Sequence, residues 1–227
     1  MHNLPSILVL LAALNEEKGI YHTLAELKQH LRISKFLVVD GNSDDRTVRV
    51  AKNFGADVLR QEGKGKGDAL AFALRNVNDD FDYVILIDAD YTYPAKFIPK
   101  MIQILESNPR LGMVCGNRFN SHFHVEWMPN IYYVGNRLLA LTHNLLNGVK
   151  MRDPLSGLRV LRWKILKNWK PRSRGFDIEA EMNYFVERQG FGIKEIDIEY
   201  RPRIGVKKLK LRHGIQILKR MIADFNT

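Results

Sequence analysis

Short apolar runs alternate with helical patterns along the first half of the chain. Runs rich in Val, Ile and Leu predict strands over 6–13, 35–40, 57–61, 83–88 and 112–118. Apolar residues that recur at i, i+3 and i+4 predict helices over 17–31, 45–54, 66–77 and 94–107. Strands that are apolar throughout and separated by helices are typical of a mainly parallel sheet covered on both faces. The first half therefore predicts an α/β fold.

The second half has a different order of elements. We expect helices over 129–146 and 176–188, and strands over 158–163 and 193–200. An amphipathic helix is expected over 211–225, with basic residues beside its apolar face. The apolar face consists of Ile215, Leu218, Ile222 and Phe225. No internal repeat or linker interrupts these patterns, so we expect one domain over 1–227.

Composition limits the class of protein. A hydrophobic share of 45% and a charged share of 26% are those of an ordinary soluble globular protein. The single cysteine, Cys115, excludes an internal disulfide and a cysteine metal site, so a metal must bind oxygen or imidazole. No apolar run reaches the roughly 18 residues of a membrane span. Contact with a membrane is therefore expected at its surface.

The net charge of +10 is concentrated near the end of the chain. No acidic residue occurs over 201–220, where eight basic residues lie. Nucleic acid, an anionic lipid surface and a phosphorylated substrate all favour such a charge. A basic segment that is only solvated is the remaining alternative.

Two carboxylates, Asp88 and Asp90, follow an apolar run at the expected end of a strand. Two buried like charges repel, and a divalent cation removes that cost. Hard oxygen ligands suit Mg²⁺ or Mn²⁺, and Mg²⁺ commonly combines one or two carboxylates with substrate phosphates. The alternative is a polar turn after a strand, because Asp-x-Asp alone is a short motif.

Polar residues also follow three other predicted strands. The segments concerned are 15–17, 40–45 and 61–67. A carboxylate at a strand end can accept from a base N–H and a ribose hydroxyl, and a Gly/Lys loop that opens a helix can place backbone amides and a cation against phosphate. Taken singly, Asp44 and Asp45 fit a helix cap, and the glycines fit a flexible turn. Because parallel strands end at one sheet edge, the four segments together predict a nucleotide site.

These motifs resemble, in order and spacing, those of family 2 glycosyltransferases with the GT-A fold, and most of all the dolichyl-phosphate mannose and glucose synthases. The motifs in the first half are Asn15-Glu16-Glu17, Val39-Asp40-Gly41-Asn42-Ser43, Gly65-Lys66-Gly67 and Asp88-Ala89-Asp90. Those in the second half are Gly116-Asn117-Arg118, Gly135-Asn136-Arg137, Asp153-x-x-Ser156-Gly157, Gly175-Phe176-x-x-Glu179 and Tyr200-Arg201-x-Arg203 with Lys207-Lys208. The resemblance covers nearly the whole chain. It implies a single GT-A domain, Rossmann-like, with a mainly parallel central sheet flanked by helices.

The resemblance also implies a donor site. Its residues are expected to be Leu14, Asn15, Glu17, Asp40, Lys66, Asp88 and Ala89. Among them, Asp40 would contact the base and Lys66 would lie near the ribose or diphosphate. Asp88 and Asp90 would bind the metal, Mg²⁺ or Mn²⁺. Thr92 stands where mannose synthases usually have Gln, which leaves the third metal ligand open.

Basic residues of the second half are implied for the acceptor. The expected acceptor-binding residues are Arg118, Arg137, Ser156, Arg201 and Lys208, and the expected catalytic residues are Asp90, Arg118, Arg137 and Lys208. Residues 1–120 would form the half that binds the nucleotide-sugar, 121–210 the half that binds the acceptor, and 211–227 the amphipathic helix.

The implied reaction is the inverting transfer of a hexose from a UDP- or GDP-sugar to a polyprenyl or dolichyl phosphate. A phosphate acceptor is already ionised at pH 7 and needs no general base. An alcohol acceptor needs a carboxylate, for which Asp153 or Glu179 is available in the sequence. The alternative reading keeps the donor and replaces the lipid by a soluble sugar or a phosphorylated small molecule.

The closing helix and the basic segment before it bear on location. A basic, amphipathic helix fits an anionic membrane surface, although a helix packed on the domain has the same pattern. We expect a cytoplasmic protein that lies peripherally on the cytoplasmic face of a membrane. A nucleic-acid partner is not expected, because carboxylates at four strand ends repel phosphate without a metal and no nucleic-acid-binding module is recognised.

Overall fold

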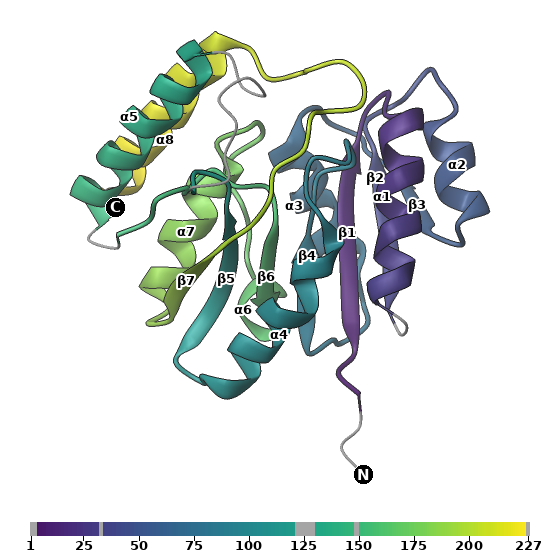
Figure 1. The fold of residues 1–227 in the computed structure, drawn as a ribbon, viewed down its shortest axis with the longest axis horizontal. Coiled ribbons are helices and arrows are strands. Elements are labelled where there is room, and N and C mark those ends of the chain that lie inside the picture. Colours follow the sequence, from purple (N-terminus) through teal and green to yellow (C-terminus); the bar gives the residue numbers. More distant parts are fainter. Residues whose placement is uncertain (1–3, 32–33, 121–129, 148–149, 226–227) are drawn as a thin grey trace.

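One seven-stranded sheet forms the centre of the protein, which we describe from a computed structural model for residues 4–31, 34–120, 130–147 and 150–225. Its strands are β1 (Ile7–Ala13), β2 (Lys35–Asp40), β3 (Asp57–Arg60), β4 (Tyr83–Leu86), β5 (Leu111–Asn117), β6 (Arg159–Arg162) and β7 (Gly192–Asp197). They lie in the order β3-β2-β1-β4-β6-β5-β7 (Figure 1).

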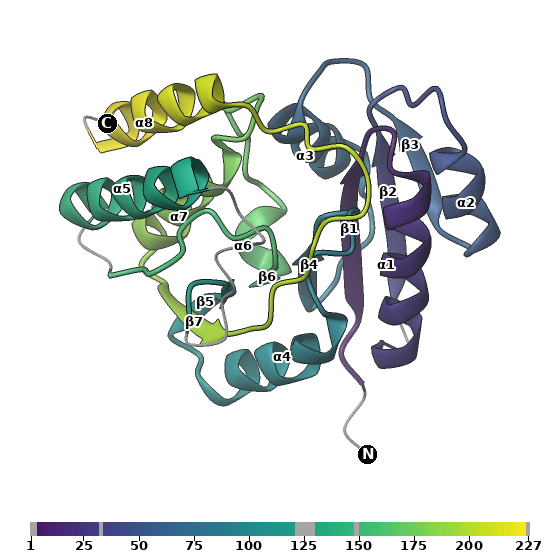
Figure 2. The same cartoon turned by 45° about the horizontal axis from the view of Figure 1, so that its top comes forward.

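Helices cover both faces of this sheet (Figures 1 and 2). They are α1 (Glu17–His30), α2 (Thr47–Asn53), α3 (Lys66–Asn76), α4 (Ile98–Ser107), α5 (Asn130–Asn147), α6 (Trp163–Leu166), α7 (Ile178–Arg188) and α8 (Leu211–Phe225), with a 3-10 turn, η1 (Ala95–Phe97), before α4. Among the described helices, none has the length and apolar character needed to cross a bilayer.

The parallel register brings several strand ends to one edge of the sheet. β1 pairs in parallel with β2 and β4, and Ala13 lies opposite Asp40 at the shared end. β6 runs antiparallel to both β4 and β5, whereas β5 and β7 pair in parallel. The expected mainly parallel sheet is therefore confirmed, with one reversed strand inside it.

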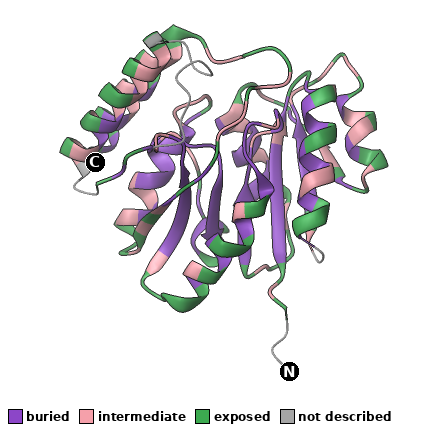
Figure 3. Cartoon of the chain, in the orientation of Figure 1, coloured by how far each residue is buried: buried purple, intermediate pink, exposed green. Residues whose placement is uncertain are grey.

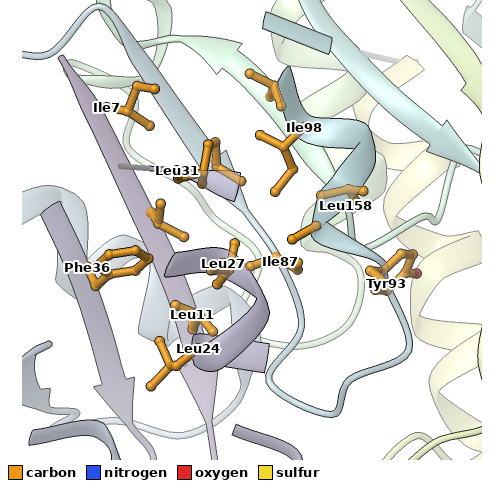
Figure 4. Close-up of a cluster of buried hydrophobic side chains, with 14 of the residues drawn as sticks. Ile7, Leu11, Leu24, Leu27, Leu31, Phe36, Ile87, Tyr93, Ile98 and Leu158 are labelled. Atoms are coloured by element: carbon orange, nitrogen blue, oxygen red, sulfur yellow. The ribbon is translucent and has the colours of Figure 1, made fainter. Parts of the chain in front are cut away.

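The sheet is apolar on both faces because each face has its own core. On β1, Val9 and Leu11 face the core beneath α1 and α4, whereas Leu8 and Leu10 face the core beneath α3 and α7. Figure 4 shows the first core, in which Leu24 and Leu27 of α1 lie beside Leu11, and to which Ile98 of α4 also belongs. This double burial explains why the strands read as continuous apolar runs.

The predicted elements are found within a few residues of their expected bounds. The strand expected over 158–163 ends at Arg162, because Trp163 begins the short helix α6, which was not expected. The helix expected over 94–107 begins as η1 and becomes α-helical at Ile98, with proline in its first turn. The helix expected from 129 is α5, and its first expected residue lies outside the described part of the chain.

Candidate active site

A cavity of about 870 Å³ lies at the edge where β1, β2 and β4 end. Its other wall comes from the first turns of α5 and α8 and from the segment that joins β7 to α8, residues 198–210. We call this the β7–α8 segment. The expected site residues that line the cavity are Leu14, Lys66, Asp88, Ala89, Asp90, Arg118 and Lys208.

The loops at this edge are held in unusual backbone conformations. Asn15, Asn42 and Tyr91 follow β1, β2 and β4 and have φ values of 50°, 67° and 67°. The first two loops also bind each other: the Asn15 amide donates to Ser43 Oγ at 2.9 Å, and the Asp44 amide donates to Asn15 Oδ1 at 2.8 Å. Left-handed residues other than glycine are uncommon and tend to occur at functional sites. The edge is thus a fixed scaffold for the side chains above it.

Lys66, in the first turn of α3, joins two carboxylates from different elements. Its Nζ lies 2.5 Å from Asp88 Oδ1 and 2.5 Å from Glu179 Oε1 of α7. Burial works against the Lys66 cation, but the two carboxylates outweigh it and raise the pKa of Lys66. Burial likewise favours the neutral acid at Asp88, yet Lys66 lowers the pKa of Asp88 overall. The ammonium group is therefore a permanent positive charge inside the cavity.

Asp90 is a buried carboxylate with a single cationic neighbour from the second half. It is 5% exposed, and Arg203 Nη1 donates to its Oδ2 at 2.5 Å. Its Oδ1 accepts from the Thr92 hydroxyl at 2.6 Å. Burial first, and then the negative charge of Asp88, raise the pKa of Asp90. A further positive charge beside Asp90 would therefore stabilise the ionised form.

Glu16 is a second buried carboxylate on the same wall. Arg203 also pairs with its Oε1, and Lys208 Nζ donates to that oxygen at 2.6 Å. Its Oε2 is buried and has no hydrogen-bond partner among the described residues. Burial raises the pKa of Glu16 despite the two cations. Arg203 and Lys208 thus tie the β7–α8 segment to the ends of β1 and β4.

Arg118, directly after β5, is fixed by a buried carboxylate. Its Nε and Nη2 each donate to Asp153 at 2.7 Å, and its backbone amide donates to Asp153 Oδ2 at 3.0 Å. Burial opposes the Arg118 cation, but Asp153 raises its pKa overall. Because Asp153 is fully buried and accepts all three bonds, it is poorly placed to act as a general base.

The Gly/Lys loop is packed more tightly than a flexible turn. Gly65 has φ +96°, and a Cβ there would lie 2.3 Å from the Arg174 carbonyl oxygen. The amides of Gly67 and Asp68 donate to the carbonyls of Gly175 and Arg174 at 3.1 and 3.2 Å. Amides of this loop were expected to approach phosphate, but these two are bound to protein. Lys64, Gly65 and Lys66 of the loop line the cavity.

The residues present fit a divalent cation. Asp88 and Asp90 supply hard oxygen ligands two residues apart, and Glu16 Oε2 on the same wall is a buried carboxylate oxygen without a hydrogen-bond donor among the described residues. Within the described residues, no group of three His, Cys, Asp or Glu side chains converges on one point. The described residues therefore offer Asp88 and Asp90 as a pair of carboxylates, which would suit a Mg²⁺ or Mn²⁺ ion that takes its remaining ligands from water and phosphate.

Several expected site residues do not line the cavity. Glu17 pairs with the exposed Arg46 at 3.1 Å, and the fully buried Asp40 accepts from the Ser43 amide. Arg201 forms a two-pronged pair with Glu26, at 2.6 and 3.0 Å. Their expected roles remain predictions.

Three more expected residues lie beside the cavity without lining it. The exposed Arg137 on α5 reaches the Arg152 carbonyl at 3.5 Å. Ser156 is fully buried, and its Oγ has no partner among the described residues. Asn15 bonds the neighbouring loop, while its carbonyl accepts from Lys208 at 3.0 Å.

The structure adds cavity residues that were not assigned a site role from the sequence. Glu16 lines the cavity where Glu17 was expected, and Arg203 does so where Arg201 was expected. Glu179, considered only as a base for an alcohol acceptor, holds Lys66. Where two residues of the same type are adjacent or separated by one position, the sequence does not indicate which of them points into the cavity.

Comparison with known proteins relates the sequence of this chain to transferases. Residues 8–169 match the family described as Glycosyl transferase family 2. In Haloferax volcanii, a low-salt glycan biosynthesis hexosyltransferase, Agl6, is 32% identical over 91% of this chain and 50% of its own length. A dolichyl-phosphate hexose transferase of the same organism is 30% identical over 88% of this chain and 85% of its own length. The chain thus spans half the length of the first of these relatives.

The fold is also that of a solved enzyme. Glucosyl-3-phosphoglycerate synthase from Mycobacterium tuberculosis, in complex with Mn²⁺, UDP-glucose and phosphoglyceric acid, aligns with a TM-score of 0.78 at 21% identity. The alignment covers 98% of this chain and 80% of that one. A further structure of that enzyme contains Mg²⁺ and UDP, with a TM-score of 0.78 at 21% identity.

Proposed function

Because this chain belongs to glycosyl transferase family 2, we propose that it transfers a hexose from a nucleotide diphosphate-sugar to a polyprenyl or dolichyl phosphate, with inversion. The relatives that carry hexosyltransferase names support the transferred group, and one of them carries dolichyl phosphate in its name. The proposal leaves UDP- and GDP-sugars both open as donors. The proposal keeps residues 1–120 as the donor half and 121–210 as the acceptor half.

The observation that carries this proposal is the arrangement of charge around one cavity. Asp88 and Asp90 lie at the end of β4, with Lys66 beside the first and Arg203 beside the second. Carboxylates that bind a metal and a lysine that is always protonated are the groups that hold a diphosphate and stabilise it as it departs. Both kinds occur here within hydrogen-bonding distance of each other.

In the proposed reaction, an oxygen of the lipid phosphate attacks the anomeric carbon as the bond from that carbon to the nucleotide diphosphate breaks. A Mg²⁺ or Mn²⁺ ion, when bound at Asp88 and Asp90, would neutralise the departing diphosphate. Lys66 would hold the same oxygens, and Arg118 and Lys208 would align the acceptor phosphate. The products are a nucleoside diphosphate and a lipid-linked phosphosugar, and no proton has to be removed.

Two features support a phosphate acceptor over an alcohol. The carboxylates considered as general bases are both engaged, Asp153 by Arg118 and Glu179 by Lys66 at 2.5 Å. Cations from the second half, Arg118, Arg203, Lys207 and Lys208, line the cavity. The positive charge of these side chains favours an anionic acceptor.

Product partitioning tests the proposal. Labelled UDP-glucose or GDP-mannose is supplied with Mn²⁺ and either a polyprenyl monophosphate or 3-phosphoglycerate, and label is counted in the organic and aqueous phases. We expect label in the organic phase with the polyprenyl phosphate, and its loss in Asp90→Asn. Asp79→Asn, an exposed carboxylate before β4, is the matched control. Label that moves only to phosphoglycerate would establish the soluble-acceptor alternative instead.

A further inference from the structure

Helix α5 carries a continuous stripe of exposed apolar side chains. Its members recur at alternating spacings of three and four residues, which places them on one face of the helix. Each is more than half exposed, from 57% to 75%. The stripe consists of Ile131, Val134, Leu138, Leu141 and Leu145. Scattered exposed leucines are ordinary, but a regular row of five is not.

Helix α8 carries a second stripe with the same kind of spacing. Its most exposed members are between 47% and 60% exposed. They are Leu211, Ile215, Ile222 and Phe225, and the half-buried Leu218 fills the gap in the row. The other side of α8 is buried at Ile217 and Met221.

Helices α5 and α8 lie side by side, so the two stripes lie on one pair of neighbouring helices (Figures 1 and 2). Their buried sides converge: Leu139 and Leu146 of α5 pack with Ile217 and Met221 of α8 against Ala180 of α7. The exposed sides therefore point away from the sheet, and exposed residues recur along both helices in Figure 3. We call the two stripes together the docking face.

The charge around the docking face is almost entirely positive. Segments 130–150 and 205–225 contain eight basic residues and one acid. That acid, Asp224, is 1% exposed and accepts from Arg172 and Arg220. The basic residues are Arg137, Lys150, Lys207, Lys208, Lys210, Arg212, Lys219 and Arg220. Arg220 is paired with Asp177 and Asp224, and Lys208 is paired with Glu16. The exposed cations beside the stripes are therefore Arg137, Lys150, Lys207, Lys210, Arg212 and Lys219.

We propose that the docking face binds the surface of an anionic lipid bilayer. Apolar side chains would enter the boundary between headgroups and acyl chains, and the flanking cations would contact lipid phosphates, each contributing about 1 kcal/mol near such a surface. A second copy of this chain is a poorer occupant, because a symmetric dimer through this face would bring two basic rims together.

Docking at this face would place the active-site cavity against its lipid acceptor. Ile131 of α5 and Leu211 of α8 belong to the stripes and also line the cavity, whose lining includes Asp88 and Asp90. A phosphate at the bilayer surface would then meet the cavity at its mouth. In this respect the inference rests on the proposed function, and it extends that function by adding α5 to the membrane contact that the sequence predicted for α8 alone.

Vesicle flotation without any nucleotide-sugar tests the docking face separately from catalysis. The protein is mixed with vesicles of phosphatidylcholine, with or without phosphatidylglycerol, and the bound fraction is measured. We expect binding that requires phosphatidylglycerol and weakens with salt. Leu138→Glu with Leu141→Glu should reduce the partition coefficient at least about tenfold, since each buried leucine is worth more than a factor of ten. Neither residue lines the cavity.

Leu4→Glu is the matched control, because Leu4 is 72% exposed and lies near the N-terminal end, away from the docking face (Figure 1). It should bind vesicles as the wild type does, and circular dichroism should show that all variants are folded. The proposal is overturned if the wild type does not float, or if the double variant floats equally well. It is also overturned if the wild type is a dimer that the double variant dissociates. Donor binding in a thermal shift assay reports separately on the proposed function.

Discussion

Arg203 joins two buried carboxylates that follow different strands. It pairs with both Asp90 and Glu16, and it occupies Asp90 Oδ2, an atom expected to bind the metal. A cation side chain and a divalent ion cannot both hold one buried oxygen at full strength. In the absence of metal, Arg203 therefore acts as an internal counter-ion.

Replacing Arg203 should strengthen metal binding. In Arg203→Gln the competing guanidinium is gone, so Mn²⁺ should bind about tenfold more tightly, a charge-assisted hydrogen bond being worth about 1.5 kcal/mol or more. The free Mn²⁺ signal in electron paramagnetic resonance, recorded without nucleotide, measures this affinity. Arg203→Lys keeps the charge and should resemble the wild type. Weaker Mn²⁺ binding in Arg203→Gln would contradict the competition.

The buried His143 and the half-buried Glu187, neither of which lines the cavity, give opposite pH dependences. Burial lowers the pKa of His143 to about 4 from 6.5, so the folded protein holds fewer protons than the unfolded chain in that window. Stability due to His143 is therefore lost as pH falls from 6.5 toward 4, by up to about 3 kcal/mol. Burial raises the pKa of Glu187 to about 7 from 4.5, so its contribution is lost as pH rises through that window.

Single variants should separate these two contributions. Between pH 7 and pH 4, His143→Gln should lose less unfolding free energy than the wild type in urea titrations. Glu187→Gln should lose less than the wild type as pH rises from 4.5 to 7. If both variants follow the wild-type curve in parallel, neither group titrates as the structure indicates.

Within each site segment, the sequence did not predict which residue faces the cavity. The sequence marked 15–17 and 200–203 as site segments, but it could not say that Glu16 and Arg203 face the cavity. Arg201 and Arg203 share one side of an ideal extended chain, so alternation cannot separate them. The backbone decides, because Arg201 N donates to Thr92 O at 3.0 Å and Ile204 N to Asp90 O at 3.1 Å, which bends the segment between them.

At the scale of elements, the first turn of α3 packs closely against a neighbouring backbone. A Cβ on Gly67 would lie 2.3 Å from the Ser173 carbonyl oxygen, a backbone atom that cannot easily move. Gly67→Ala should therefore reduce the free energy of unfolding by about 1–3 kcal/mol, as overpacking does. Urea unfolding measures the change.

Gly214, inside α8, provides the control for that substitution. A Cβ there meets no atom within 4 Å, so Gly214→Ala should raise stability by about 0.5–1 kcal/mol through helix propensity. Equal effects of the two substitutions would show that the close packing of Gly67 on Ser173 does not restrict that position.

Strands that are buried on both faces of the sheet were predicted well. β1, β2 and β4 are apolar on both faces, and their patterns fixed their type and approximate ends. The direction of β6 was not predictable, because Arg159–Arg162 has the same side-chain pattern whether it runs parallel or antiparallel. The exposed stripe of α5 was also missed, since an apolar row in a sequence does not reveal which rows are left uncovered.

At the scale of the whole molecule, the site lies where the two halves of the chain meet. The first half supplies Lys66, Asp88 and Asp90, and the second supplies Arg118 and the β7–α8 segment that holds Glu16. Where the two halves meet, buried carboxylates of the first half are paired with cations of the second half, which offsets the cost of burying them. A donor and metal bound there would therefore stabilise the fold as a whole.

Thermal unfolding with UDP-glucose and GDP-mannose, each with Mn²⁺ or with EDTA, tests this account most directly. At 100 to 1,000 times its Kd, the true donor should add about 2–4 kcal/mol of stability and raise Tm clearly. We predict that at least one nucleotide-sugar raises Tm with Mn²⁺ and not with EDTA, that Asp90→Asn loses the effect, and that Asp79→Asn keeps it. A Tm unchanged by either donor, or raised equally in EDTA and in Asp90→Asn, would contradict a metal-dependent donor site at the end of β4.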